Sequence, residues 1–143
     1  MISRWGRQAA GVLFLCSTTR RVGLALRSAY VNEPHTYGLV GGAVDPGEDA
    51  RKAVSREAWE EIGCHLDPRK LVELHVHREP GFQYTTYLCV TKQEFQVPPE
   101  NLNWETDAFA WLDLASLPAN IHPDVAILLA DPEVSGCWAG VRD

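Results

Sequence analysis

Three glutamates occupy nearly one face of a short predicted helix near the middle of the chain. Glu57, Glu60 and Glu61 fall within about 100° of arc on a helical wheel. A Gly-Gly pair at 41–42 and a further acid, Glu48, precede them. Two carboxylates ~5 Å apart repel each other by about 3 kcal/mol at an effective dielectric constant of ~20. Such a cluster therefore needs either a bound cation or a fully solvated surface.

The apolar stripe of the same helix borders these acids, so we expect the carboxylates to lie at the edge of the core. Arg56 is placed to pair with Glu60, four residues later. Glu57 and Glu61 have no basic neighbour on the helix apart from His65. Sites built from oxygen ligands favour Mg²⁺ or Mn²⁺ over zinc or copper. The pattern indicates a divalent-cation site, with a salt-bridged, solvated surface as the alternative.

The spacing of these residues resembles the Nudix box, G-x5-E-x7-R-E-U-x-E-E-x-G-U, where U is a bulky aliphatic residue. The match runs from Gly42 to Cys64 and includes every fixed polar and glycine position. It departs from the pattern at two U positions, where Ala58 is small and Cys64 is unusual. Just upstream, the stretch YGLVGG is similar to the W-x-x-P-G-G of many members, with Tyr37 in the tryptophan position and Val40 in the proline position.

This resemblance implies a fold and an activity. The fold is an α/β, Nudix-type α/β/α sandwich with a mixed β-sheet, as a single Nudix hydrolase domain over residues 1–143. The activity is metal-dependent hydrolysis of a pyrophosphate bond in a nucleoside diphosphate derivative, a (d)NTP among the candidates. The implied cofactor is Mg²⁺ or Mn²⁺, and the implied partner is a small-molecule nucleotide. The alternative is a non-catalytic Nudix-fold nucleotide-binding or sensor module, which usually loses acids that this chain keeps.

The resemblance also implies roles for individual residues. The metal ligands that it implies are Glu57, Glu60, Glu61 and the backbone carbonyl of Gly42. Glu57 is also at the position of the general base in some members. Arg56 and Glu48 resemble the pair that braces the loop against the helix and orients the catalytic acids.

Three further candidates lie outside the box. Glu105 stands six residues before Trp111, a spacing that resembles an acid and a tryptophan in some triphosphate-cleaving members. Glu105 is therefore the alternative base, or else a surface acid at the start of a strand. Arg27 leaves its strand on the face opposite the leucines, where it either contacts a phosphate or faces solvent. Tyr37 either stacks on a nucleobase or packs in the protein.

Apolar runs, alternation and residue type predict the elements that must position these residues. We expect strands near residues 9–16, 22–27, 37–42, 72–77, 82–90 and 105–112, a helix over residues 49–62 and a last helix from residues 122–123. Asp49 is expected in the first turn of the acidic helix, and Gly63 is expected to end it. Apolar and polar residues alternate from Val72 to His77, which predicts a half-buried strand.

Bulk composition narrows the class of protein. A chain of 143 residues with 45% hydrophobic residues suits one hydrophobic core, and a net charge of −6 argues against a duplex-nucleic-acid partner. Four cysteines form no C-x-x-C pair, and no apolar run is long enough to span a membrane. We therefore expect a soluble, cytoplasmic protein without membrane contact. Trp59 points away from the acids, either as outer-layer packing or at a homodimer interface.

Overall fold

The computed structural model describes residues 7–141 of the chain, so Trp5 lies outside the described residues. The strands are β1 (Arg7–Cys16), β2 (Val22–Arg27), β3 (Tyr37–Gly38), β4 (Val40–Ala43), β5 (Val72–Glu79), β6 (Phe82–Thr91) and β7 (Thr106–Leu112). The helices are α1 (Ala50–Ile62), α2 (Pro123–Ala130) and α3 (Pro132–Ala139), with short 3₁₀ turns at Pro68–Lys70, Pro99–Asn101 and Leu114–Ser116.

Strand β1 organises the mixed sheet. One edge of β1 runs parallel to β6 along its whole length, and β5 returns antiparallel beside β6. The other edge is shared, because the first half of β1 pairs with β4 and the last residues pair with β2, both antiparallel. Strand β2 in turn pairs with β3 and β7. The sheet therefore divides beside β1, and β4 carries the Gly-Gly pair along the first half of that strand.

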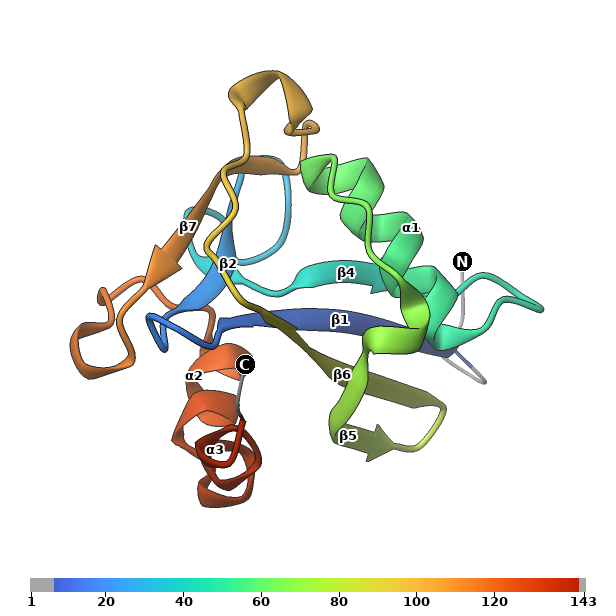
Figure 1. Ribbon diagram of the computed structural model, residues 1–143. Coiled ribbons are helices and arrows are strands. Elements are labelled where there is room, and N and C mark those ends of the chain that lie inside the picture. The colour runs from blue at the N-terminus through green and yellow to red at the C-terminus, as the bar shows by residue number, and fades with distance from the viewer. Residues whose placement is uncertain (1–6, 142–143) are drawn as a thin grey trace.

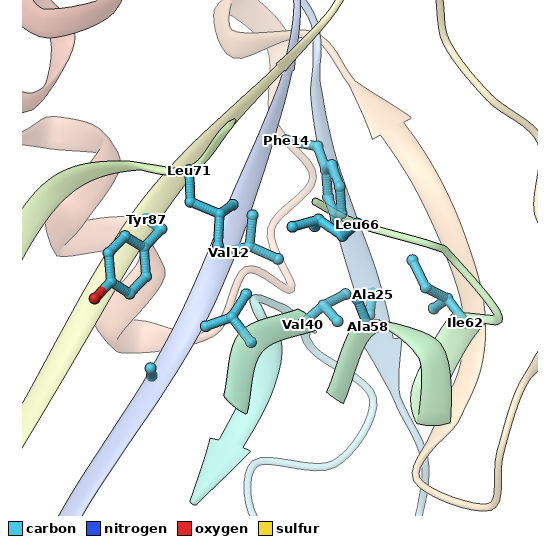
Figure 2. Packing of buried hydrophobic residues seen from close by; sticks show 11 residues of the cluster. Val12, Phe14, Ala25, Val40, Ala58, Ile62, Leu66, Leu71 and Tyr87 are labelled. Atoms are coloured by element: carbon cyan, nitrogen blue, oxygen red, sulfur yellow. The ribbon is translucent and has the colours of Figure 1, made fainter. Parts of the chain in front are cut away.

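Helices cover the two faces of the sheet and bury two hydrophobic clusters (Figure 1). The first cluster lies under α1, where Val40, Ala58 and Ile62 meet Val12 and Phe14 (Figure 2). The second cluster lies under α2 and α3. Because successive side chains of a strand point to opposite faces, the continuous apolar run of β1 supplies both clusters. The expected α/β/α sandwich with a mixed sheet is confirmed.

Helix α1 is shifted by one residue from its predicted start. Asp49 precedes the helix as its N-cap, with its carboxylate accepting a hydrogen bond of 2.8 Å from the backbone N–H of Arg51. An N-cap residue has extended backbone, so Asp49 does not lie in the first turn as expected. Gly63 ends the helix in the left-handed conformation, with φ of 66°, as predicted.

The burial predicted for the strand at 72–77 is wrong at Val72, whereas Leu74 and Val76 are partly buried as expected. Val72 is 59% exposed, whereas Leu71, just before the strand, is 3% exposed and joins the first cluster. Strand β5 is an edge strand, and a bulge between Glu73 and His75 breaks the alternation of its side chains. A period of two in the sequence does not reveal such a shift.

The chain ends with two helices where the sequence predicts one. Asp131 caps the second of them by accepting a hydrogen bond of 2.9 Å from the N–H of Glu133, and Pro132 begins it. This added helix α3 places Trp138 in the second cluster at 7% exposure. All four cysteines are free thiols, and Cys16 alone among them is fully buried. No helix within residues 7–141 combines the length and the apolar character needed to cross a bilayer.

Candidate active site

The packing of α1 decides where its acids lie. Its buried side chains include Ala53, Val54, Ala58 and Ile62, which press the helix onto β1 and β4. Glu61 is buried with them at 6% exposure, and the Glu57 side chain is 14% exposed. The Glu60 side chain, by contrast, is 49% exposed. The acidic face therefore grades from the interior at Glu61 to solvent at Glu60.

The two inner acids face the Gly-Gly pair of β4. The Oε2 atom of Glu61 accepts a hydrogen bond of 3.0 Å from the backbone N–H of Gly41. A Cβ atom on Gly42 would stand 2.7 Å from Oε1 of Glu57, so only the absent side chain lets this carboxylate approach the strand. The sequence identified Gly42 but missed Gly41, whose N–H makes the direct contact.

Burial makes it unfavourable for both carboxyl groups of this pair to be ionised at once. It raises the pKa of Glu61 to about 9, and the charges of Glu57 and Glu105 act in the same direction. Burial also raises the pKa of Glu57, although the neighbouring Arg56 opposes this effect. Without a cation, the pair therefore retains a proton at neutral pH.

Arg56 joins the acidic helix to the loop before it. Its guanidinium donates two hydrogen bonds to the Glu48 carboxylate, from Nε at 3.0 Å and from Nη2 at 3.1 Å. This contact is the main reason that the pKa of Glu48 lies below its usual range. Arg56 also donates to the carbonyl of Ala43 at 3.1 Å. The contacts have the geometry that the sequence resemblance implied for the Glu48–Arg56 pair.

The expectation that Glu57 lacks a basic partner is wrong. Nη1 of Arg56 lies 3.1 Å from Oε1 of Glu57 and 3.1 Å from Oε1 of Glu60. Residues adjacent on a helix do not face each other, so helical spacing alone did not suggest the first of these contacts. The long arginine side chain reaches it by folding across the helix surface toward Glu48.

Glu105 approaches the acids from the loop before β7. The backbone N–H of Asn103, two residues before Glu105, donates a hydrogen bond of 3.1 Å to the carbonyl of Glu61, so this loop lies against the end of α1. The charge of Glu105 is one of the causes of the raised pKa of Glu61. The backbone carbonyl of Glu105 accepts a hydrogen bond of 2.9 Å from the N–H of Ser28, a residue 1% exposed. The loop of Glu105 therefore lies beside α1, although Glu105 follows Glu61 by 44 residues in the sequence.

Arg27 and Tyr37 lie outside the acidic face. Nε of Arg27 donates a hydrogen bond of 2.7 Å to the carbonyl of Asn32. Arg27 lowers and Glu61 raises the pKa of the buried Tyr84 hydroxyl, whose principal shift is upward through burial. Tyr37 is partly buried and packs against the second cluster. The structure thus gives Arg27 a backbone partner in Asn32 and Tyr37 a packing contact with the second cluster.

The chemistry of the donors fits a hard divalent cation. Glu57 and Glu61 are clustered carboxylates, one partly buried and one buried, with raised pKa values, and a dication would offset their mutual repulsion. The space beside Gly42 leaves its backbone accessible to Glu57. In residues 7–141, however, no three acidic, histidine or cysteine side chains already stand in the arrangement of a metal site. Glu60 would have to turn away from Arg56 to join the other two acids.

Comparisons with known proteins support the fold described above. A family model described as the NUDIX domain matches residues 5–131. No curated protein sequence matches the chain. A MutT NUDIX hydrolase from Burkholderia pseudomallei has a similar structure, with 27% identity and a TM-score of 0.67 over 86% of this chain and 95% of that one.

Two other solved structures share the fold at lower identity. A Nudix hydrolase from M. smegmatis, RenU, has 19% identity and a TM-score of 0.72, covering 100% of this chain and 92% of its own. A bifunctional NMN adenylyltransferase/ADP ribose pyrophosphatase from Francisella tularensis has 20% identity and a TM-score of 0.59, covering 90% of this chain and 42% of that one.

Proposed function

Since the chain belongs to the Nudix family, we propose that it hydrolyses a pyrophosphate bond in a nucleoside diphosphate derivative with the help of Mg²⁺ or Mn²⁺. The observation that carries this proposal is the carboxylate pair of the partly buried Glu57 and the buried Glu61, which faces the Gly41–Gly42 strand. An ordinary folded protein gains nothing from two adjacent carboxylates held at the edge of its core.

In this proposal Glu57, Glu61 and the backbone carbonyl of Gly42 hold the cation, and Glu60 joins them by leaving Arg56. A bound divalent cation neutralises phosphate charge and lowers the pKa of water in its coordination shell. Because the cation relieves the repulsion among the clustered acids, that repulsion favours cation binding. The clustered acids alone would bind a proton instead, as their raised pKa values indicate.

The protein's own side chains have three further tasks. Glu57 accepts a proton from the attacking water, with Glu105 as the second candidate for that role. The Glu48–Arg56 pair holds the loop against α1, so that the carboxylates keep their orientation. Arg27 offers positive charge to a phosphate of the substrate, and Tyr37 lines the approach to its base.

We propose a small nucleotide, such as a (d)NTP, as the substrate. Support comes from Glu105, which stands six residues before Trp111 in a loop whose Asn103 N–H donates to the carbonyl of Glu61. The ADP ribose pyrophosphatase among the similar structures has 20% identity to this chain, a similarity that supports the fold and does not identify the substrate. Nucleotide sugars and dinucleoside polyphosphates belong in the same test.

The test is a hydrolysis assay on a panel of nucleotides with Mg²⁺ or Mn²⁺, followed by analysis of the products. We expect the wild type to cleave at least one nucleotide and Glu61→Gln to lose about 100-fold or more in kcat. Glu73→Gln, which alters an exposed acid on β5, is the matched control and should retain wild-type activity. Equal, negligible cleavage by the wild type and Glu61→Gln would instead identify a nucleotide-binding module.

A further inference from the structure

The side chain of Asn103 bridges the end of α1 and Glu105. Its amide Nδ2 donates a hydrogen bond of 3.3 Å to Oε1 of Glu105, while its Oδ1 accepts one of 3.0 Å from the backbone N–H of Glu105. The backbone N–H of Asn103 donates at 3.1 Å to the carbonyl of Glu61. Asn103 therefore contacts the backbone of Glu61 and both the backbone and the carboxylate of Glu105.

We infer that Asn103 is a positioning residue, which orients the carboxylate of Glu105 toward the acids of α1 during hydrolysis. The inference rests on the proposed function, since it concerns the same reaction. It goes beyond the Nudix box, which ends at Cys64 and assigns nothing to the loop that contains Asn103.

The two ends of the amide have separable tasks. Oδ1 shapes the turn, because it satisfies the N–H of Glu105 within the loop. Nδ2 acts on the carboxylate itself and limits its rotation. An asparagine is suited to both tasks, since its amide is an acceptor at one atom and a donor at the other. An aspartate has the same shape but can only accept when ionised, and it would repel Glu105.

The loop is anchored on both sides of this contact. The carbonyl of Glu61 belongs to the last turn of α1, and Ser28 fixes the carbonyl of Glu105 at the end of β2. These contacts hold the backbone of Glu105 even without Nδ2 of Asn103. They do not fix its carboxylate, which would rotate about the side-chain bonds if Nδ2 were lost. Loss of Nδ2 should therefore disturb the carboxylate more than the fold.

Asn103→Asp tests the inference because it preserves the acceptor and removes the donor. We expect kcat to fall about 10- to 100-fold while KM changes by less than about 3-fold. In a Glu105→Gln background, the same substitution should change kcat by less than about 2-fold, since the group through which Asn103 acts is already neutralised. Asn101→Asp is the matched control, because Asn101 lies in the same loop against Gly63.

The outcomes separate this inference from the proposed function. Wild-type hydrolysis combined with full activity of Asn103→Asp would show that only the turn-forming acceptor matters, and would overturn the inference alone. An equal loss of kcat in the wild-type and Glu105→Gln backgrounds would also overturn it. Absence of hydrolysis by the wild type on every nucleotide would overturn the proposed function and this inference with it. Thermal unfolding of each variant shows whether a loss of kcat accompanies a loss of structure.

Discussion

The carboxylate of Glu61 is tied to the backbone of Gly41, with Oε2 accepting the N–H at 3.0 Å. This contact joins the most buried acid of α1 to the strand that pairs with the first half of β1. It satisfies one oxygen of Glu61 and leaves the carboxyl group beside Glu57 with a strongly raised pKa. The consequences of this arrangement can be measured with and without a cation.

Without divalent cations, the protein should lose stability as the pH rises. Burial raises the pKa of Glu61 from the ordinary 4.5 to about 9, so the folded state holds a proton that the unfolded chain has released. The stabilisation is complete below about pH 4.5 and is lost up to about pH 9, at no more than about 1.4 kcal/mol per pH unit for this group. Urea unfolding in a chelating buffer between pH 5 and pH 8 measures this slope.

Glu61→Gln should flatten the slope, because a neutral amide cannot titrate. Glu60→Gln is the control, since the half-exposed Glu60 side chain lies on the same helix. A slope that is unchanged by Glu61→Gln would show that other groups govern the pH dependence.

Mg²⁺ or Mn²⁺ should stabilise the folded protein through the acid pair. A ligand at 100 times its Kd contributes about 2.7 kcal/mol to the free energy of unfolding. Binding requires deprotonated carboxylates, so the increase in Tm should be larger at pH 8 than at pH 6. Thermal unfolding of the wild type and of a Glu57→Gln, Glu61→Gln double variant provides the comparison. The same increase in both proteins would place the cation elsewhere.

Arg56→Lys should impair both stability and activity. A lysine cannot reproduce the two hydrogen bonds from the guanidinium to Glu48. We expect a loss of about 1–3 kcal/mol in the free energy of unfolding and at least about 10-fold in kcat. Arg69→Lys is the control, because Arg69 also pairs with a carboxylate, that of Asp67, but its side chain is 90% exposed. The effect of Arg69→Lys on the free energy of unfolding and on kcat should be much smaller than that of Arg56→Lys.

The two glycines of β4 should respond differently to alanine. A Cβ on Gly41 would lie 2.2 Å from the backbone oxygen of Ala10, so Gly41→Ala must distort the sheet and destabilise the fold. A Cβ on Gly42 meets the flexible carboxylate of Glu57, so Gly42→Ala should fold but lose most of its activity. Circular dichroism melts and the hydrolysis assay separate these effects. An active Gly42→Ala protein would contradict the proposed place of Glu57 in the reaction.

A glycine outside the site provides the control. A Cβ on Gly136 in α3 would meet no atom within 4 Å. Gly136→Ala should therefore raise the free energy of unfolding by about 0.5–1 kcal/mol through helix propensity and leave kcat unchanged.

Two tryptophans should differ in their contribution to stability. Trp138 is 7% exposed in the second cluster, and its carbonyl accepts a hydrogen bond of 2.5 Å from Arg20. Trp138→Ala should lower the free energy of unfolding by about 3–5 kcal/mol. Trp59 is 53% exposed and stacks on His65. Trp59→Ala should therefore change the free energy of unfolding by about 0.5 kcal/mol or less. Denaturant unfolding of the two variants tests this ranking.

Local patterns in the sequence were sufficient to predict the acidic helix. Its apolar period, the acids on one face and the glycine at its end are all encoded within 15 consecutive residues, 49–63. The same spacing identified the family, and apolar runs, alternation and residue type in the other segments predicted the strands of the sandwich. These features could be read directly because helical and strand geometry depend on neighbouring residues.

Features that depend on pairing between distant segments could not be predicted in this way. The bulge in β5, the exposure of Val72 next to the buried Leu71, and the packing of α3 on the second cluster are such features. The 3.1 Å contact between Arg56 and Glu57 arises because Glu48 draws the guanidinium across the helix. Spacing on a helical wheel contains no information about that loop.

The sequence alone determined which side chains are acidic, how they are spaced on α1 and which family they resemble. Tertiary structure decided that Glu61 reaches Gly41 and that Asn103 brings Glu105 to the same end of the helix. The contacts of Glu61 with Gly41 and with Asn103 join segments 20 or more residues apart, and sheet pairing and burial bring such segments together. Burial, which no local pattern specifies in full, is also the main cause of the raised pKa of Glu61.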